Sequence, residues 1–399
     1  MIKTLALLSL QTGIALASTH HLPLRLSSLP EPAKIAAAQT KADDSCCEAP
    51  SNGEVVGLDD QLWGKSGDRK ELIASIDNSL RYLQTASAAK VYSEYPVPGV
   101  SRERVTRSLT RFKQLVSSSK SPTQLRDAVK KEFSFFQSVG NDNKGTVYYT
   151  GYYEPIHQGS RIRTAEYKYP LYKQPADFAN WAKPHPTRLQ LEGIDGLQAA
   201  KGSLAGSELL YMKDRWEAVL VQIQGSAKFN LTDGTSTTVG FNGGTDYGYE
   251  SIGKSLLKDK KITQAQATLQ GMKKFFAENP KELDTYVSRY NRFVFMKDTN
   301  NGPPMGSINV PVTAERSIAT DKSVMPPGAL ALVHTSLPYY QNGKLQQRLV
   351  SRYVLDQDTG SAITGAGRVD YFMGVGKEAG ERAGVTGGNG KLYYLLLKK

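Results

Sequence analysis

The sequence predicts a mainly β protein with α-helices, of the α+β class, in which a group of helices precedes the strands. Apolar residues recur at helical spacing in three stretches before residue 140, which indicates amphipathic helices. Beyond Gly306 nearly all of the chain consists of short strand-like runs between turns that contain Gly or Pro. This pattern is typical of a small barrel or sandwich and unlike a regular alternation of strands and helices. The 399 residues, 39% of them apolar, suffice for two or three domains.

The first 17 residues are interpreted as a secretory signal peptide. Lys3 supplies a positive charge, a short apolar run follows, and residues 15–17 (Ala-Leu-Ala) have the form of a signal-peptidase site. An uncleaved membrane anchor is the alternative. No cysteine directly follows the apolar run. We therefore expect an exported protein of the periplasm or cell envelope, without a lipoprotein anchor.

Residues 18–62 are rich in Pro, Ser, Ala and Lys and lack periodicity, which predicts a disordered linker. Cys46 and Cys47 fall within it. Adjacent cysteines form a strained disulfide at best, so the pair is interpreted as incidental or intermolecular rather than catalytic.

Three helices are predicted next, over residues 68–84, 102–117 and 122–139. Ser121 before Pro122 is a suitable start for the third helix, because proline is favoured at the first helical position. After Gly140 the pattern changes. Strand-like runs occur at residues 146–153, 218–224, 291–296, 317–319, 329–334, 347–356, 368–374 and 392–397.

Two further local signals lie between these runs. Helical spacing returns at residues 249–258 and 264–279. Asp233-Gly234 separates the runs 229–231 and 236–241 and predicts a hairpin, because this dipeptide adopts the positive φ angles of a tight turn.

Composition and motifs exclude several kinds of site. Lys and Arg number 50 against 38 Asp and Glu, and the net charge of +12 favours anionic polymers such as acidic cell-wall glycan. Nucleic-acid binding is not supported, because the basic residues are scattered and no RRM or zinc-finger signature occurs. With five histidines, two cysteines and no H-E-x-x-H, neither a metal nor a cofactor is expected. The absence of G-x-S-x-G gives no support for a nucleophile elbow.

Residues 248–255 (GYESIGKS) match the phosphate-loop pattern, but we interpret them differently. A phosphate loop follows a buried apolar strand, whereas residues 242–247 are Gly-rich and polar, and Glu250 would face the polyphosphate. Nucleotide binding is therefore not expected. The segment is interpreted as a loop that caps a helix beginning near Ser251.

Two carboxylates near the C-terminus are candidates for catalysis. Asp358 and Asp370 both lie close to glycines, and the segment between them is small enough to fold back and bring them to one cleft. Arg368 and Asp370 alternate with Val369 on a predicted strand, so both project to one side. A carboxylic acid beside a second carboxylate has a raised pKa and suits general acid catalysis of glycosidic cleavage. Asp near Gly also hydrogen-bonds turns, and the spacing by itself leaves both interpretations open.

From about Tyr148 to the C-terminus the chain resembles the membrane-bound lytic murein transglycosylase A family. No single motif is specific, but their order is. The matching segments are TGYYEP at 150–155, VQIQGS at 221–226, YESIGK at 249–254, NRFVF at 291–295, RSIATD at 316–321, PPG at 326–328, DTG at 358–360 and GKEAGERAG at 376–384.

The resemblance implies a double-psi β-barrel domain with an inserted second β-rich domain, preceded by N-terminal helices. On this basis residues 63–156 and 286–399 form the helices and barrel, and residues 157–285 form the inserted substrate-binding domain. It also implies that Asp370 is the sole acid/base, with Asp358 and Thr150 near it. Candidate substrate-binding residues are Thr150, Tyr152, Gln224, Gly225 and Ser226.

The implied activity is a peptidoglycan lytic transglycosylase that cleaves the β-1,4 bond between N-acetylmuramic acid and N-acetylglucosamine and leaves a 1,6-anhydro end. A hydrolase on the same barrel, with Asp358 as the base for a water, and a non-catalytic peptidoglycan-binding protein are the alternatives. The expected partner is the glycan strand, with peripheral association with the wall or outer membrane, and the protein is expected to be a monomer. Family members are often outer-membrane lipoproteins, from which this chain departs.

Overall fold

The computed structural model describes residues 22–30, 55–360 and 362–399. The predicted signal peptide and the Cys46-Cys47 pair lie outside these ranges. Among the described helices, none combines the length and the apolar character needed to cross a bilayer.

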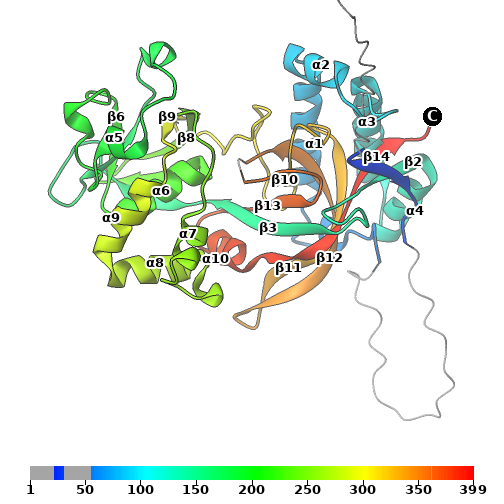
Figure 1. Cartoon of the computed structure of the whole chain (residues 1–399). Helices are drawn as coiled ribbons and strands as arrows, with labels where there is room; N and C mark the ends of the chain where they lie inside the picture. Colours follow the sequence, from blue (N-terminus) through cyan, green and yellow to red (C-terminus); the bar gives the residue numbers. More distant parts are fainter. Residues whose placement is uncertain (1–21, 31–54, 361) are drawn as a thin grey trace, which may run out of the picture.

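A closed barrel of six strands forms the centre of the molecule (Figure 1). The strands follow the order β14-β11-β12-β10-β13-β3, and pairing of β3 with β14 closes the ring. They are β3 (Val147–Glu154), β10 (Ser317–Ala319), β11 (Leu330–Gln341), β12 (Lys344–Asp358), β13 (Arg368–Val375) and β14 (Gly387–Leu397). Helix α10 (Lys377–Val385) packs on β3 and β13. The barrel and the helices around it confirm the predicted α+β class.

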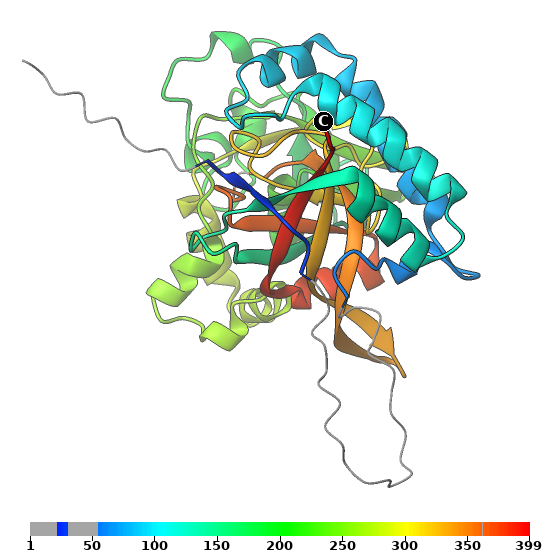
Figure 2. The same cartoon turned by 90° about the vertical axis from the view of Figure 1, so that its right-hand side faces the viewer.

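Four helices cover the outside of the barrel (Figure 2): α1 (Arg69–Leu83), α2 (Ala86–Ser93), α3 (Arg102–Ser118) and α4 (Pro122–Glu132). Their apolar faces bury residues such as Leu72, Ile76 and Phe112 in the same core as the barrel strands, which is why helices predicted from periodicity are present here. The hydroxyl of Ser121 caps α4 by accepting from the Gln124 backbone N–H, and Pro122 follows as predicted.

The predicted helix at residues 122–139 is wrong in its second half. The helix ends at Glu132, and β2 (Phe133–Ser138) pairs antiparallel with β14. Residues 133–136 (Phe-Ser-Phe-Phe) carry three large aromatic side chains, which suit a strand. The partner strand that decides the outcome lies about 260 residues later in the sequence.

The predicted linker is also corrected in part. Leu24–Ser27 form β1, which pairs with β2, and Asp60–Leu62 form a short 3-10 helix. Just before that helix the side chain of Asp59 is fully buried and ion-pairs with two arginines, at 2.6 Å from Arg316 and 3.5 Å from Arg352. Both arginines belong to the part of the chain that forms the barrel. A contact with residues distant in sequence therefore orders this segment, although its local composition predicts disorder.

The segment between β3 and β10, here called the insert (residues 156–298), forms a second region beside the barrel (Figure 1). A four-stranded sheet has the order β4-β7-β8-β9, and β5 pairs with β6. The strands are β4 (Ile156–Gly159), β5 (Tyr169–Tyr172), β6 (Glu208–Met212), β7 (Ser226–Leu231), β8 (Ser236–Gly244) and β9 (Val294–Asp298). The helices are α5 (Arg188–Glu192), α6 (Arg215–Gln224), α7 (Ile252–Lys258), α8 (Leu269–Glu278) and α9 (Pro280–Arg289).

Within the insert the predicted hairpin and the predicted helix start near Ser251 are confirmed, and the strand predicted at residues 218–224 is wrong. Strands β7 and β8 form the predicted hairpin around Asp233-Gly234, and Ser251 caps α7 through the Lys254 backbone N–H. Residues 218–224, expected as a strand, belong to α6. The side chain of Asp214 caps this helix, and Gly225 ends it with a φ of 83°, so its apolar run is a buried helix face. A short apolar run does not separate a buried strand from a buried helix.

Candidate active site

Three polar side chains line up across adjacent barrel strands. Ala319 on β10 pairs with Asp358 on β12 on one side and with Asp370 on β13 on the other, and Asp370 in turn pairs with Thr150 on β3. Residues opposite one another on neighbouring strands project from the same face of a sheet. Asp358, Asp370 and Thr150 therefore share one face of the barrel, and Ala319 is the residue between the two aspartates in the row.

A β-bulge places Asp358 in this row. Ile318 pairs with Asp356, whereas the next residue, Ala319, pairs with Asp358, so Gln357 is the extra residue. Without the bulge, alternation along β12 would place Gln357 opposite Ala319 and turn Asp358 to the other face. Bulges beside active sites commonly redirect a side chain in this way.

The two carboxyl groups differ in their hydrogen bonds. Asp358 Oδ2 accepts from the Tyr152 hydroxyl at 2.9 Å, and Oδ1 accepts from the backbone N–H groups of Ser307 at 2.9 Å and Thr359 at 2.8 Å. Asp370 Oδ1 accepts from the Thr150 hydroxyl at 2.7 Å, its one hydrogen bond within the described part of the chain. Three donors favour an ionised carboxylate, so Asp358 is the better stabilised anion of the two.

Burial raises the pKa of Asp370 to about 6, and the negative charge of Asp358 acts in the same direction against the Thr150 hydrogen bond and the positive charge of Arg368. Burial also raises the pKa of Asp358, opposed mainly by its hydrogen bonds to Thr359, Tyr152 and Ser307. Asp370, with fewer stabilising donors and a pKa of about 6, is the carboxyl group that holds a proton at mildly acidic pH.

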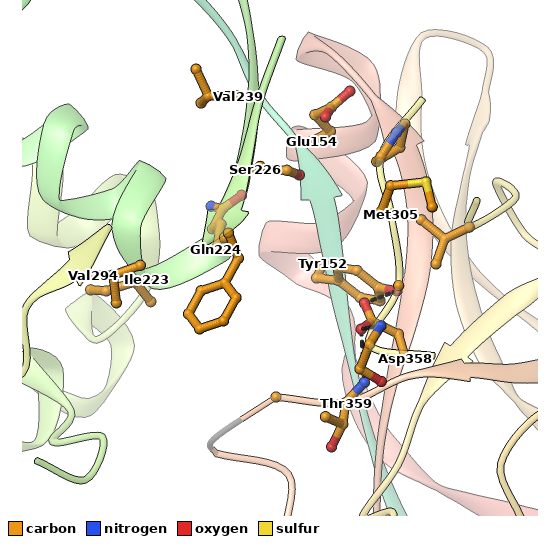
Figure 3. A pocket seen from close by; sticks show the side chains of 18 of the residues that line it. Tyr152, Glu154, Ile223, Gln224, Ser226, Val239, Val294, Met305, Asp358 and Thr359 are labelled. Atoms are coloured by element: carbon orange, nitrogen blue, oxygen red, sulfur yellow. Dashed lines mark hydrogen bonds between the residues drawn. The ribbon is translucent and has the colours of Figure 1, made fainter. Parts of the chain in front are cut away.

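A groove of about 460 Å³ runs between the barrel and the insert. Asp358, Tyr152 and Phe372 line it from the barrel, and Gln224, Gly225 and Ser226 line it from the junction of α6 and β7. Figure 3 shows Gln224 and Ser226 on the far side of the groove from Tyr152 and Asp358. Asp370 and Thr150 are not part of the lining. They lie further along the row, two strands and three strands beyond Asp358, and Asp370 is half-buried.

The structure also shows groove residues to which the sequence analysis assigned no role. Glu154 lines the groove and is buried, with no partner for Oε1 within the described residues, and burial raises its pKa to about 7. The sequence contains a signal for this role of Glu154: it follows Tyr152 by two residues on one strand, and residues two apart on a strand share a face. Ser307, whose backbone N–H binds Asp358, gave no such signal because it lies in a loop 51 residues away.

No group of three or more His, Cys, Asp or Glu side chains is arranged to hold a metal ion in the described ranges.

Comparison with family models covers most of the chain from β3 onward. The model described as the MltA specific insert domain matches residues 148–297, and the model described as the 3D domain matches residues 316–396. Together these matches span more than half of the chain and include both members of the carboxylate pair. The chain belongs to the membrane-bound lytic murein transglycosylase A family.

Relatives that carry the name of this family agree with the assignment. The chain is 29% identical over 263 residues to membrane-bound lytic murein transglycosylase A of Escherichia coli strain K12, covering 65% of this chain and 68% of the relative. The Vibrio cholerae protein of the same name is 27% identical, with 66% and 68% covered.

Two solved structures share the fold. Escherichia coli MltA with bound chitohexaose is 23% identical with a TM-score of 0.67, covering 94% of this chain and 95% of that one. The membrane-bound lytic murein transglycosylase from Agrobacterium tumefaciens is 23% identical with a TM-score of 0.66, covering 83% and 93%. At this identity the likeness concerns the fold.

Proposed function

We propose that this protein is a peptidoglycan lytic transglycosylase that cleaves the β-1,4 bond between N-acetylmuramic acid and N-acetylglucosamine and leaves a 1,6-anhydromuramic end. The observation that carries the proposal is the unequal carboxyl pair of Asp358 and Asp370 beside a groove, in a member of this family. The similarity to a structure described with bound chitohexaose supports a groove that accepts a glycan chain.

Asp370 acts as the acid and then as the base. Its proton passes to the oxygen that bridges the two sugars while the bond from that oxygen to C1 of the muramic residue breaks. The resulting carboxylate takes the proton of the C6 hydroxyl of the same sugar, and the C6 oxygen forms a new bond to C1. One bond breaks, one forms, and the proton on Asp370 is restored, so no water is consumed.

A single catalytic acid suffices because the nucleophile belongs to the substrate. An intramolecular hydroxyl has a high effective molarity, which replaces the second carboxylate that glycosidases use to activate water or attack the sugar. Asp358 is held as an anion by three donors. In this position it raises the pKa of Asp370 and offsets the positive charge that develops at C1.

The groove provides groups that suit a sugar chain. Gln224 and Ser226 supply polar groups from the insert, and Tyr152 and Phe372 supply aromatic surface from the barrel. The Oε1 atom of Gln224 is buried without a partner in the described part of the chain, which leaves it an acceptor for an amide N–H. Such an amide is present on each N-acetylated sugar.

Export and attachment to the wall fit the same function. The N-terminal sequence predicts secretion, and a net charge of +12 favours the carboxylates of wall peptides. We propose a peripheral, salt-dependent association with the cell wall or outer membrane, and action as a monomer.

Product analysis tests the proposal directly. Purified protein is incubated with peptidoglycan sacculi, and the released muropeptides are identified by mass spectrometry. A lytic transglycosylase yields anhydro ends, whereas a hydrolase yields reducing muramic ends that are heavier by one water. Asp370→Asn should abolish most release and keep the thermal midpoint of the wild type. Reducing ends would replace the proposal with hydrolysis, and binding without release would replace it with a non-catalytic role.

A further inference from the structure

Arg368 occupies an unusual position beside the catalytic acid. It lies two residues before Asp370 on β13 and pairs with Tyr148 on β3, so its side chain leaves the same face of the barrel as Asp370. The guanidinium carbon lies 5.3 Å from the centre of the Tyr148 ring, and Nη2 donates to Thr150 Oγ1 at 3.0 Å. Arg368 forms no ion pair with any described carboxylate, and its buried Nε has no partner there.

The direction of the hydrogen bonds from Arg368 follows from chemistry. A guanidinium group has donors and no acceptor, so the oxygen of Thr150 must accept from Arg368. The single hydroxyl proton of Thr150 is then free to point to Asp370 Oδ1, which lies 2.7 Å away. Oδ1 accepts this hydrogen bond, and it is the one oxygen of Asp370 that has a partner among the residues described here.

We propose that Arg368 is a positioning residue that acts through Thr150 to place the catalytic proton on Oδ2 of Asp370. Oδ1 is occupied as an acceptor, so the protonated acid presents its hydrogen from a single oxygen in a single orientation. This inference rests on the proposed function, in which Asp370 donates that proton. A proton shared between two equivalent oxygens would be correctly placed for only part of the time.

The charge of Arg368 has a second consequence. The charged and titratable groups around Asp370 are Arg368 on β13, Asp358 on β12 and Tyr152 on β3, with Lys322 after β10 acting on Asp358. Asp358 raises the pKa of Asp370, and Arg368 lowers it. Loss of Arg368 therefore raises the pKa of Asp370 further. The protonated carboxyl group becomes a weaker acid toward the bridging oxygen, and the carboxylate that takes up the C6 proton becomes a stronger base.

The test uses two pairs of variants of the full chain. Arg368→Met removes the charge and the donors, and Arg368→Lys keeps a charge and a donor. Thr150→Val removes the hydroxyl that links them, and Thr150→Ser keeps it. Arg348→Met is the matched control, because Arg348 also lies over a tyrosine ring, 5.5 Å from Tyr339, but forms an ion pair with Asp60.

Two readouts are measured for each variant. The first is the pKa of the Asp370 carboxyl group, from its carbon-13 chemical shift during a pH titration. The second is kcat and KM for release of anhydro products at several pH values. We expect Arg368→Met and Thr150→Val to raise the pKa of Asp370 and to lower kcat about tenfold, as for loss of one hydrogen bond to a charged group, with KM near that of the wild type. Arg368→Lys and Thr150→Ser should recover part of both changes.

The two proposals fail in different ways. An unchanged pKa of Asp370 in Arg368→Met, or the same shift in Arg348→Met, overturns the role of Arg368 whatever the activity is. If wild-type protein releases no anhydro product, the proposed function fails, while the titration still decides whether Arg368 and Thr150 control the protonation of Asp370. A fall in kcat with an unchanged pKa and no recovery in the lysine variant would mean that Arg368 is merely structural.

Discussion

Asp358 and Asp370 lie on opposite sides of Ala319, each one strand away from it, and project from the same face of the barrel. At about 4.8 Å per strand their backbones are separated by roughly 10 Å. At this separation the charge of one carboxyl group affects the pKa of the other, but the two groups do not form a hydrogen bond with each other. Three donors stabilise the Asp358 anion, whereas Asp370 accepts from one donor and has its pKa raised to about 6.

The pH dependence of activity should follow the protonation of Asp370. The acid must be protonated to donate, and its pKa is about 6, so kcat/KM should fall tenfold for each pH unit well above that value. The measurement is the initial rate of release of anhydro products between pH 4 and pH 9. A rate that stays constant from pH 6 to pH 8 would contradict the assignment of Asp370 as the acid.

Replacement of Asp358 should change both the rate and its pH dependence. Asp358→Asn removes the negative charge that raises the pKa of Asp370, so the alkaline limb should move to lower pH. Loss of the anion near the developing positive charge should lower kcat by about 10²-fold. Tyr152→Phe, which removes just one of the three donors to Asp358, should have a smaller effect. A wild-type pH profile in Asp358→Asn would exclude the proposed coupling of the two groups.

The small side chain at position 319 should be necessary for activity. Ala319 is 3% exposed and lies between the two carboxyl groups, so Ala319→Leu inserts three carbons into that space. The expected cost in the free energy of unfolding is about 1–3 kcal/mol, with a large fall in kcat/KM. Ile318→Val is the control: Ile318 is buried and points to the opposite face, so its change should cost about 1 kcal/mol and leave activity intact. Equal loss of activity in both variants would argue against a specific role for Ala319.

The N-terminal segment should contribute strongly to stability through Asp59. Its buried carboxylate pairs with Arg316 and Arg352 and accepts from the Tyr353 backbone N–H at 3.0 Å. Asp59→Ala leaves two buried arginines without that partner and should lower the free energy of unfolding by about 3–5 kcal/mol, as measured by urea denaturation.

The exposed pair of Glu166 and Lys213 provides the control for Asp59. Glu166→Ala should change the free energy of unfolding by no more than about 1 kcal/mol, because both partners are solvent-exposed. If Asp59→Ala cost no more than this control, the segment before α1 would not be an integral part of the barrel core.

Local sequence determined the elements whose signals are local. Residues 102–117 have a complete helical face and a serine cap, and Asp233-Gly234 defines a hairpin turn, so both could be predicted without knowledge of the fold. The family motifs that contain residues 150, 224 and 358 also indicated the candidate site, because each motif is a short run of residue types in a fixed order. What these signals share is that each depends on neighbours within a few residues.

Tertiary structure decided the features that depend on a distant partner. Residues 133–138 became a strand because β14 offered free backbone groups, and Leu24–Ser27 became ordered because β2 then presented an edge. The bulge at Gln357 turned Asp358 toward Asp370, and the loop at Ser307 supplied one of its donors. The sequence by itself thus gives the residue types of the acid and its neighbours. Their relative orientation, and with it the difference in proton affinity, arises from pairing between strands that lie far apart in the chain.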